Sequence, residues 1–239
     1  MARCLLAQGR CGRLGRPCRS GQCVARTVRR LHERRWRDKL GLFVAEGEDL
    51  VDAALAAGYD ADELLVAGEN VEPALLADVS TLAHPPRFLG VFRRRDSAGV
   101  AGTTLALWRI ADPGNVGTLL RAADAFDAGV MLSEGCADPF GPKALRAGMG
   151  STFRVPISGF ELPANALALV SAGGEPLDEL DLDRYAAFVL GSEREGLPDE
   201  VLSRCAARAT IPVQNVESLN VAMTGTIALY ARSRRNSDT

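Results

Sequence analysis

Short apolar runs alternate with helical patterns along the second half of the chain. The runs are TTLALWRI, GVMLSE, TFRVPI, ALALVSA, AAFVLGS and ARATIPV. They are nearly continuous in apolar residues, which is typical of strands in a parallel sheet with both faces covered, because few positions then face water. Their alternation with helical segments predicts an α/β domain.

The first half of the chain carries a different set of elements. A basic amphipathic helix is predicted from Val24 to about Leu40, followed by a short strand in GLFVAEG and a helix ending at Gly58, which suits a C-cap. A second strand is predicted in ADELLVAG, and a further helix and strand before His84. The segment HPPRFLGVFRRRDSAG predicts one more strand and the connection between two domains.

These patterns divide the chain into three parts. Residues 1–23 are rich in Arg, Gly and Cys without a helical or strand period, and we expect this basic extension to be disordered. Residues 24–100 form a first domain and residues 101–239 a second. A chain of 239 residues with 47% hydrophobic content can bury the cores that two such domains need.

Composition disfavours membrane proteins and metalloproteins. No run approaches the roughly 18 apolar residues of a membrane span, and no apolar stretch of a signal peptide follows the basic N-terminus. We therefore expect a soluble, cytoplasmic protein. Four of the six cysteines crowd the first 23 residues at spacings that miss the paired zinc-ligand pattern, and only two histidines are present. We expect neither a metal site nor, in a reducing compartment, disulfides.

Charge is distributed unevenly although the net charge is only −2. Residues 1–39 hold 12 Lys or Arg against 2 acidic residues, whereas the rest of the chain holds 16 against 28. This asymmetry indicates a polyanionic partner, although a solvated basic tail would give the same pattern. The densest basic stretch is Arg26 to Lys39, where a helix would present a cationic ridge suited to RNA phosphates.

Candidate chemistry begins at Ala111 to Phe126, ADPGNVGTLLRAADAF. Asp112-Pro113-Gly114-Asn115 is a turn sequence, and Asn115 is predicted to cap the helix that follows. Arg121 lies beside the apolar stripe of this helix, where an unpaired charge would be costly. It is either paired, extended to solvent, or functional.

Two loops follow predicted strands later in the chain. In the first, Gly191-Ser192-Glu193, the glycine allows close backbone approach to a ligand and Glu193 suits a helix start. The second, IPVQNVESLN, spans Ile211 to Asn220 and precedes an apolar helical run, for which Ser218 is a candidate N-cap. Two strand-exit loops so close in sequence can converge on one small-molecule pocket.

Together NVGTLLR, GSE and IPVQNVESLN resemble the three motifs of the SpoU/TrmH family (SPOUT superfamily) of RNA ribose 2′-O-methyltransferases. The resemblance covers about residues 24–234. It implies an α/β fold class with an L30e-like N-terminal domain that binds RNA, and a C-terminal α/β-knot (trefoil) domain with a mostly parallel sheet. The knot is expected where segments 188–201 and 211–220 thread, although ordinary topology rules predict an unknotted sheet.

The resemblance also implies site residues. The implied catalytic residues are Arg121, Asn115, Glu193, Ser218 and Asn220. The implied contacts to the cofactor, S-adenosyl-L-methionine, are Leu190, Gly191, Ile211, Leu219 and Asn220. The candidates for RNA binding are Arg30, Arg34, Arg35 and Arg37 of the basic helix, with Lys143 and Arg146 of the segment CADPFGPKALRAGMGSTFRVP, which could equally be a solvated helix face. Two residues depart from the family pattern, Asp127 at a usual Gly and Gly148 at a usual Ser.

The implied reaction is methyl transfer from S-adenosyl-L-methionine to a ribose 2′-hydroxyl of structured RNA, with rRNA favoured over tRNA, by a homodimer joined through the last helix and the knot. A guanidinium keeps its proton, so Arg121 is expected to orient the hydroxyl and stabilise developing charge, while Asn115 and Ser218 fix the geometry. An RNA phosphate or water would accept the proton. The alternatives are a non-catalytic RNA-binding protein that retains the fold, and a knotted enzyme that methylates a base nitrogen, which the NVGTLLR and SLN motifs disfavour.

Overall fold

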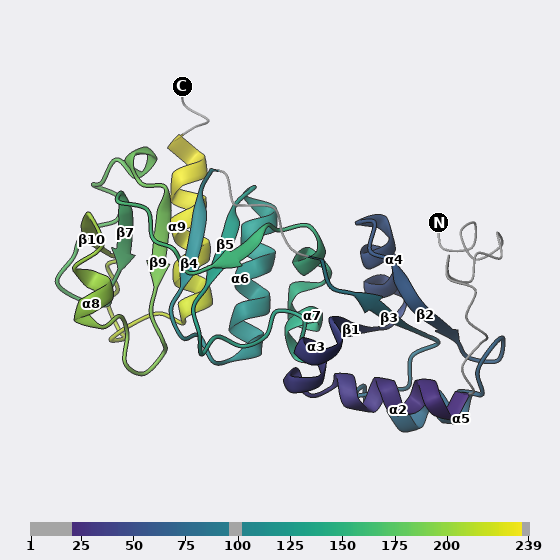
Figure 1. Cartoon of the computed structure of the whole chain (residues 1–239). Helices are drawn as coiled ribbons and strands as arrows, with labels where there is room; N and C mark the ends of the chain where they lie inside the picture. The colour runs from purple at the N-terminus through teal and green to yellow at the C-terminus, as the bar shows by residue number, and fades with distance from the viewer. Residues whose placement is uncertain (1–20, 96–101, 236–239) are drawn as a thin grey trace. The chain divides into compact units, whose positions relative to one another are not determined.

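The structure, a computed structural model, describes residues 21–95 and 102–235. These residues fall into two compact units (Figure 1). Of the described residues, the first unit contains 21–95 together with Phe140–Phe153, and the second contains 102–139 and 154–235. Of the extension expected to be disordered, residues 1–20 lie outside the described residues, whereas residues 21–23 begin a helix.

The first unit is built on a three-stranded antiparallel sheet in the order β1-β3-β2. The strands are β1 (Leu42–Glu46), β2 (Ala61–Val66) and β3 (Phe88–Arg93). The helices are α2 (Gly21–Leu31), α3 (Arg34–Leu40), α4 (Glu48–Ala56), α5 (Pro73–Val79) and α7 (Pro142–Gly148), followed by a 3₁₀ turn at Ser151–Phe153.

Both faces of this sheet are covered. Leu42 and Val44 join a core with Val28 of α2, whereas Phe43 and Ala45 join a second core on the other face. The alternation follows from the two-residue period of a strand. It explains why every residue of β1 is buried.

The prediction of one basic helix from Val24 to about Leu40 is wrong in one respect, because this segment forms two helices, α2 and α3. At the break, Arg37 Nη1 donates to the carbonyl oxygens of Leu31 (2.7 Å) and His32 (2.9 Å). An arginine of the second helix thus satisfies carbonyls that the end of the first leaves without helical partners. Hydrophobic period does not report such a contact.

Other predictions for the first unit are largely confirmed. The strands in GLFVAEG, ADELLVAG and the 84–99 segment are present, and Gly58, at φ +77°, follows the end of α4. The prediction of a strand after the next helix and before His84 is wrong. Within the described residues, α5 is followed by an irregular segment up to β3.

The second unit contains a seven-stranded sheet in the order β6-β5-β4-β9-β7-β10-β8, with every pairing parallel. Its strands are β4 (Thr104–Leu107), β5 (Gly129–Leu132), β6 (Ile157–Gly159), β7 (Ala166–Leu169), β8 (Glu175–Pro176), β9 (Ala187–Leu190) and β10 (Ala207–Thr210). Its helices are α6 (Pro113–Ala125), α8 (Asp199–Leu202) and α9 (Val221–Arg235), with a 3₁₀ turn at Leu182–Arg184.

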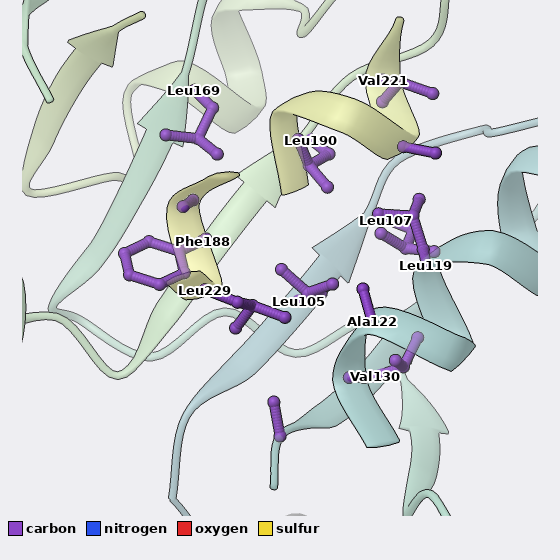
Figure 2. Packing of buried hydrophobic residues seen from close by; sticks show 14 of the residues in the cluster. Leu105, Leu107, Leu119, Ala122, Val130, Leu169, Phe188, Leu190, Val221 and Leu229 are labelled. Carbon is purple, nitrogen blue, oxygen red and sulfur yellow. The ribbon is translucent and has the colours of Figure 1, made fainter. Parts of the chain in front are cut away.

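Helices α6 and α9 cover one face of this sheet. Figure 2 shows Leu119 of α6 and Leu229 of α9 around Leu105 of β4, within one buried cluster. Ala106 and Val189 belong instead to a cluster with Val201 of α8. The mixed α/β class and the mostly parallel, doubly covered sheet are therefore confirmed.

Two details of the second unit differ from the apolar pattern. Within the run TFRVPI only Ile157 lies in a strand, because Phe153 turns into the aromatic cluster of the first unit, with its ring 5.5 Å from that of Phe43. Strand β8 has only two residues, too few to produce a period. No described helix is long and apolar enough to cross a membrane.

Candidate active site

A cavity of about 710 Å³ lies at the carboxyl ends of β7, β9 and β10. Its walls come from residues 169–171, from the 190–197 loop and from parts of the 211–224 segment. The carboxyl edge of a parallel sheet is the usual place for a ligand in an open α/β fold, because the loops after neighbouring strands gather there. All five residues predicted to contact the cofactor line this cavity, namely Leu190, Gly191, Ile211, Leu219 and Asn220.

Gly191 lies where the chain passes very close to itself. A Cβ atom at this position would stand 2.3 Å from the carbonyl carbon of Gly196 and 2.6 Å from the nitrogen of Leu197. These neighbours are backbone atoms, so they cannot swing aside as a flexible side chain would. The loop closes through hydrogen bonds from Ser192 N to Gly196 O (3.2 Å) and from Gly196 N to Ser192 O (3.0 Å).

Side chains from the three sequence motifs form one hydrogen-bonded chain. Asn115 Nδ2 donates to Glu193 Oε1 at 2.8 Å, and Asn220 Nδ2 donates to Asn115 Oδ1 at 3.2 Å. Asn115 stands in the first turn of α6, Glu193 follows β9, and Asn220 precedes α9. The structure thus brings together residues separated by up to 105 positions, at the rim of the cavity that Glu193 and Asn220 line.

The capping residues at the starts of α6 and α9 differ from those predicted from the sequence. Asp112, not Asn115, caps α6, since its carboxylate accepts from the Asn115 backbone nitrogen at 3.0 Å. Asn220, not Ser218, caps α9, because its Oδ1 accepts from the backbone nitrogens of Ala222 (2.8 Å) and Met223 (3.4 Å). The Asn115 side chain is therefore available for Glu193, and Ser218 lies exposed at the cavity.

The sequence context of Glu193 predicts a helix start, and this prediction is wrong. Glu193 stands within the tight Ser192–Gly196 turn, and α8 starts at Asp199. Ser192 Oγ accepts from Glu195 N at 3.3 Å, which stabilises the turn. The position of the Glu193 carboxylate is therefore set by the turn and by Asn115, with no helix dipole involved.

Arg121 is exposed on α6 and is not among the residues that line the cavity. It lies six positions after Asn115, which in a helix means about 9 Å along the axis and a different face. The neighbouring residues Leu119, Leu120 and Ala122 are buried, so the helix has an apolar inner face and Arg121 lies outside it.

The predicted RNA-binding residues are divided by the structure. Arg37 is only 4% exposed and donates hydrogen bonds to backbone carbonyls. The prediction that it lies on an exposed cationic ridge is therefore wrong. Arg34 and Arg35 are exposed and pair with Asp38 (3.6 Å) and Glu33 (2.7 Å). Arg30 is half-buried and lies over the ring of Trp36, a residue that the sequence reasoning did not select.

Lys143 and Arg146 lie on α7 of the first unit. Lys143 is exposed. Arg146 Nη1 donates to Thr81 Oγ1 at 2.9 Å, and Thr81 Oγ1 donates in turn to the buried carboxylate of Glu46 at 2.6 Å. Arg146 is therefore tied into an internal polar network of the first unit, whereas Lys143 lies at its surface.

Comparisons with known proteins agree with this arrangement. In Bacillus subtilis (strain 168), 23S rRNA (guanosine(2553)-2′-O)-methyltransferase RlmP is 30% identical over 84% of this chain and 92% of its own length. Human mitochondrial rRNA methyltransferase 3 is 34% identical over 52% of this chain and 36% of its own length.

Solved structures match almost the whole chain. An AdoMet-bound rRNA methyltransferase from Sinorhizobium meliloti superposes with a TM-score of 0.80 and 27% identity, covering 92% of this chain and 97% of its own. A putative RNA methyltransferase of the TrmH family from Porphyromonas gingivalis gives a TM-score of 0.79 and 30% identity, covering 92% and 100%.

The family comparison assigns both parts of the chain. Residues 25–89 match the MRM3-like substrate binding domain, and residues 102–230 match the SpoU rRNA Methylase family. The fold class predicted from the motifs is confirmed by these matches. Since the second match covers more than half of the sequence, including the loops that line the cavity, the chain belongs to the SpoU rRNA methylase family.

Proposed function

We propose that this protein transfers the methyl group of S-adenosyl-L-methionine to a ribose 2′-hydroxyl of ribosomal RNA. The observation that carries the proposal is the hydrogen-bonded chain of Asn220, Asn115 and Glu193 at the rim of the cavity. The B. subtilis relative, named as a 2′-O-methyltransferase of 23S rRNA, supports ribose as the acceptor and rRNA as the substrate class.

The cavity fits a cofactor of this kind. Its volume of about 710 Å³ lies within the range of roughly 300–1,000 Å³ that is usual for small-molecule pockets. The tight loop after Gly191 lines it with backbone, and the lining residues include three carboxylates, Glu193, Glu195 and Glu217, against one arginine, Arg194, so the wall is net negative. When bound, S-adenosyl-L-methionine supplies an electrophilic methyl group on a positively charged sulfur, which nearby carboxylates favour.

The residues of the chain hold the acceptor rather than activate it chemically. Asn115 is fixed from both sides, and its Nδ2 group has a second hydrogen to donate to an RNA oxygen. Ser218 lies at the cavity with a hydroxyl that can both donate and accept. Such fixed groups accelerate the transfer by alignment, because methyl transfer needs the hydroxyl oxygen in line with the breaking bond.

We propose that Arg121 reaches this site from a second copy of the chain, because it does not line the cavity of its own chain. We therefore propose a homodimer joined through α9. Met223, Ile227 and Tyr230, at positions i, i+4 and i+7 of α9, are 60%, 37% and 55% exposed and form one apolar stripe. The neighbouring helix α6 packs against α9 and carries the exposed Arg121, which supports a dimer in which the guanidinium comes from the partner subunit.

The first experiment measures cofactor binding by calorimetry and then tritium transfer from S-adenosyl-L-methionine to unmethylated rRNA. A labelled ribose resists alkaline cleavage at the methylated nucleotide, whereas a labelled base does not, so alkaline digestion identifies the acceptor. Cleavage at every labelled nucleotide would overturn the ribose assignment. Cofactor-independent RNA binding without transfer would favour the non-catalytic alternative.

The second experiment mixes two inactive variants, Arg121→Ala and Asn220→Ala, and allows subunits to exchange. If each site takes Arg121 from the partner subunit, half of the dimers are mixed and each has one intact site, so about a quarter of the activity returns. If Arg121 acts within its own chain, no intact site forms and the mixture stays inactive. Arg204→Ala, an exposed arginine outside the cavity, is the control and should remain active.

A further inference from the structure

Trp36 carries an unusual collection of cations on its ring. The guanidinium carbon of Arg30 lies 4.5 Å from the ring centroid, Lys39 Nζ lies 5.2 Å away and the guanidinium carbon of Arg35 lies 5.6 Å away. Arg30 comes from α2, whereas Arg35 and Lys39 flank Trp36 on α3. The ring is half-buried, and both Arg35 and Lys39 are exposed.

The nearby acidic residues neutralise Arg35 but not the other two cations at the Trp36 ring. Glu33 pairs with Arg35, while Asp38 pairs with Arg34 and Arg94. Within residues 21–95 and 102–235, neither Arg30 nor Lys39 forms an ion pair with a carboxylate. Two positive charges, those of Arg30 and Lys39, therefore remain beside the half-buried Trp36 ring without acidic compensation from the described residues.

An aromatic ring surrounded by uncompensated cations matches one ligand class closely. A nucleotide has a flat π surface for the ring and a phosphate for each neighbouring cation. We propose that Trp36, with Arg30 and Lys39, binds an unpaired nucleotide of the RNA substrate, whose base stacks on the indole while the cations contact the flanking phosphates. The proposal rests on the RNA methyltransferase function proposed above and adds to it a site for single-stranded RNA.

The exchange of a cation for a base is favourable. An exposed cation over a ring, such as Lys39 or Arg35, contributes roughly twofold to fivefold to an equilibrium, whereas a stacked base contributes roughly fivefold to 150-fold. Lys39 and Arg35 are the more distant cations and sit on flexible, exposed side chains. A displaced side chain keeps its charge beside the site and can pair with the phosphate that the base brings with it.

The test uses fluorescence of the full chain. Only Trp36 and Trp108 are tryptophans, so Trp108→Phe leaves Trp36 as the single reporter. Single-stranded oligoadenylate should quench its fluorescence, and an RNA duplex of equal length should quench much less because its bases are already stacked. Equal quenching by duplex and single strand would overturn the proposal.

Substitutions separate stacking from structure. Because both Trp36 variants lack the Trp36 reporter, their affinity is measured by calorimetry. Trp36→Leu should weaken oligoadenylate binding by roughly fivefold to 150-fold, and Trp36→Phe, which keeps an aromatic face, should recover part of the loss. Arg30→Gln and Lys39→Gln should each lower the slope of affinity against salt. Arg87→Gln is the matched control, since Arg87 lies 5.2 Å from the Phe88 ring but pairs with Glu69.

The outcomes distinguish this site from the enzyme function. If Trp36→Phe and Trp36→Leu bind oligoadenylate equally, or if both bind as the parent does, Trp36 stacks no base. That result leaves cofactor binding and methyl transfer untouched. If instead the protein binds no S-adenosyl-L-methionine, the enzyme function fails, while quenching by oligoadenylate still stands as a separate finding.

Discussion

Gly191→Ala tests whether the tight loop, and not only the empty space of the cavity, forms the cofactor site. The added methyl carbon would lie 2.3 to 2.6 Å from backbone atoms of Gly196 and Leu197, so the loop must open. Opening breaks the two hydrogen bonds between Ser192 and Gly196. It also moves Glu193 away from Asn115, to which it is bonded at 2.8 Å.

The expected loss of stability follows from these contacts. Two backbone hydrogen bonds contribute about 0.5–1.5 kcal/mol each, while replacing glycine by alanine restricts the unfolded chain and returns about 0.4–1 kcal/mol. At the midpoints of these ranges, the free energy of unfolding should therefore fall by about 1.3 kcal/mol. Affinity for S-adenosyl-L-methionine should fall more than tenfold, because the displaced loop lines the cavity.

Urea denaturation gives the stability change and calorimetry gives the affinity. The control is Gly159→Ala at the end of β6, where an added Cβ has no atom within 4 Å, and it should leave both quantities within about 0.5 kcal/mol of the parent. Parental stability and affinity in Gly191→Ala would refute the argument from backbone proximity. Loss of stability with unchanged affinity would show that the cofactor binds elsewhere.

Three further predictions follow from individual residues. Arg37→Ala should lower the free energy of unfolding by about 2–4 kcal/mol because buried carbonyls lose a charged donor, whereas exposed Arg34→Ala should change it by less than about 0.5 kcal/mol in the same urea titration; equal effects would contradict the capping role. Asp127→Gly should raise the free energy of unfolding in that titration by about 0.5–1 kcal/mol, since Asp127 has φ +51°, a left-handed conformation that glycine adopts without strain. Burial raises the pKa of the Cys205 thiol, so less thiolate is present at pH 8 and peptide-resolved alkylation there should be slower than at exposed Cys23; a faster Cys205 would contradict this.

The sequence predicts most strands of the second unit because their burial on both faces leaves a distinctive record. Phe188, Val189 and Leu190 are all buried, yet they belong to cores on opposite faces of one sheet. A run of apolar residues is the direct consequence. Order within the sheet is a different matter, since β9 lies between β4 and β7 through contacts that no local pattern encodes.

Side-chain partners are the part that sequence reasoning predicted least well. Asp112 and Asn115 are both good capping residues, and only the three-dimensional arrangement shows that Asp112 caps α6 while Asn115 reaches Glu193. Arg37 looks like its basic neighbours in the sequence, but the break between α2 and α3 buries it. Such assignments depend on competition between long-range partners, which a local pattern cannot rank.

Asp127 shows the opposite case, in which a departure from the family pattern has a physical meaning. Its left-handed backbone conformation at the exit of α6 explains why a glycine is usual there. Aspartate is among the few other residues that tolerate this conformation. The substitution therefore affects local stability and does not argue against the neighbouring motif.

Asn220 has two roles, and they couple the first turn of α9 to the proposed active site. Its Oδ1 accepts from the first amides of the helix while its Nδ2 donates to Asn115. An aspartate could do the first task but has no hydrogen for the second, so only a neutral amide joins helix and site. When the Asn220 side chain turns away, the amide of Ala222 loses its acceptor and Asn115 loses its donor at the same time, and that amide becomes open to solvent exchange. Hydrogen exchange at this amide should therefore report on the Asn220–Asn115 contact of the proposed active site.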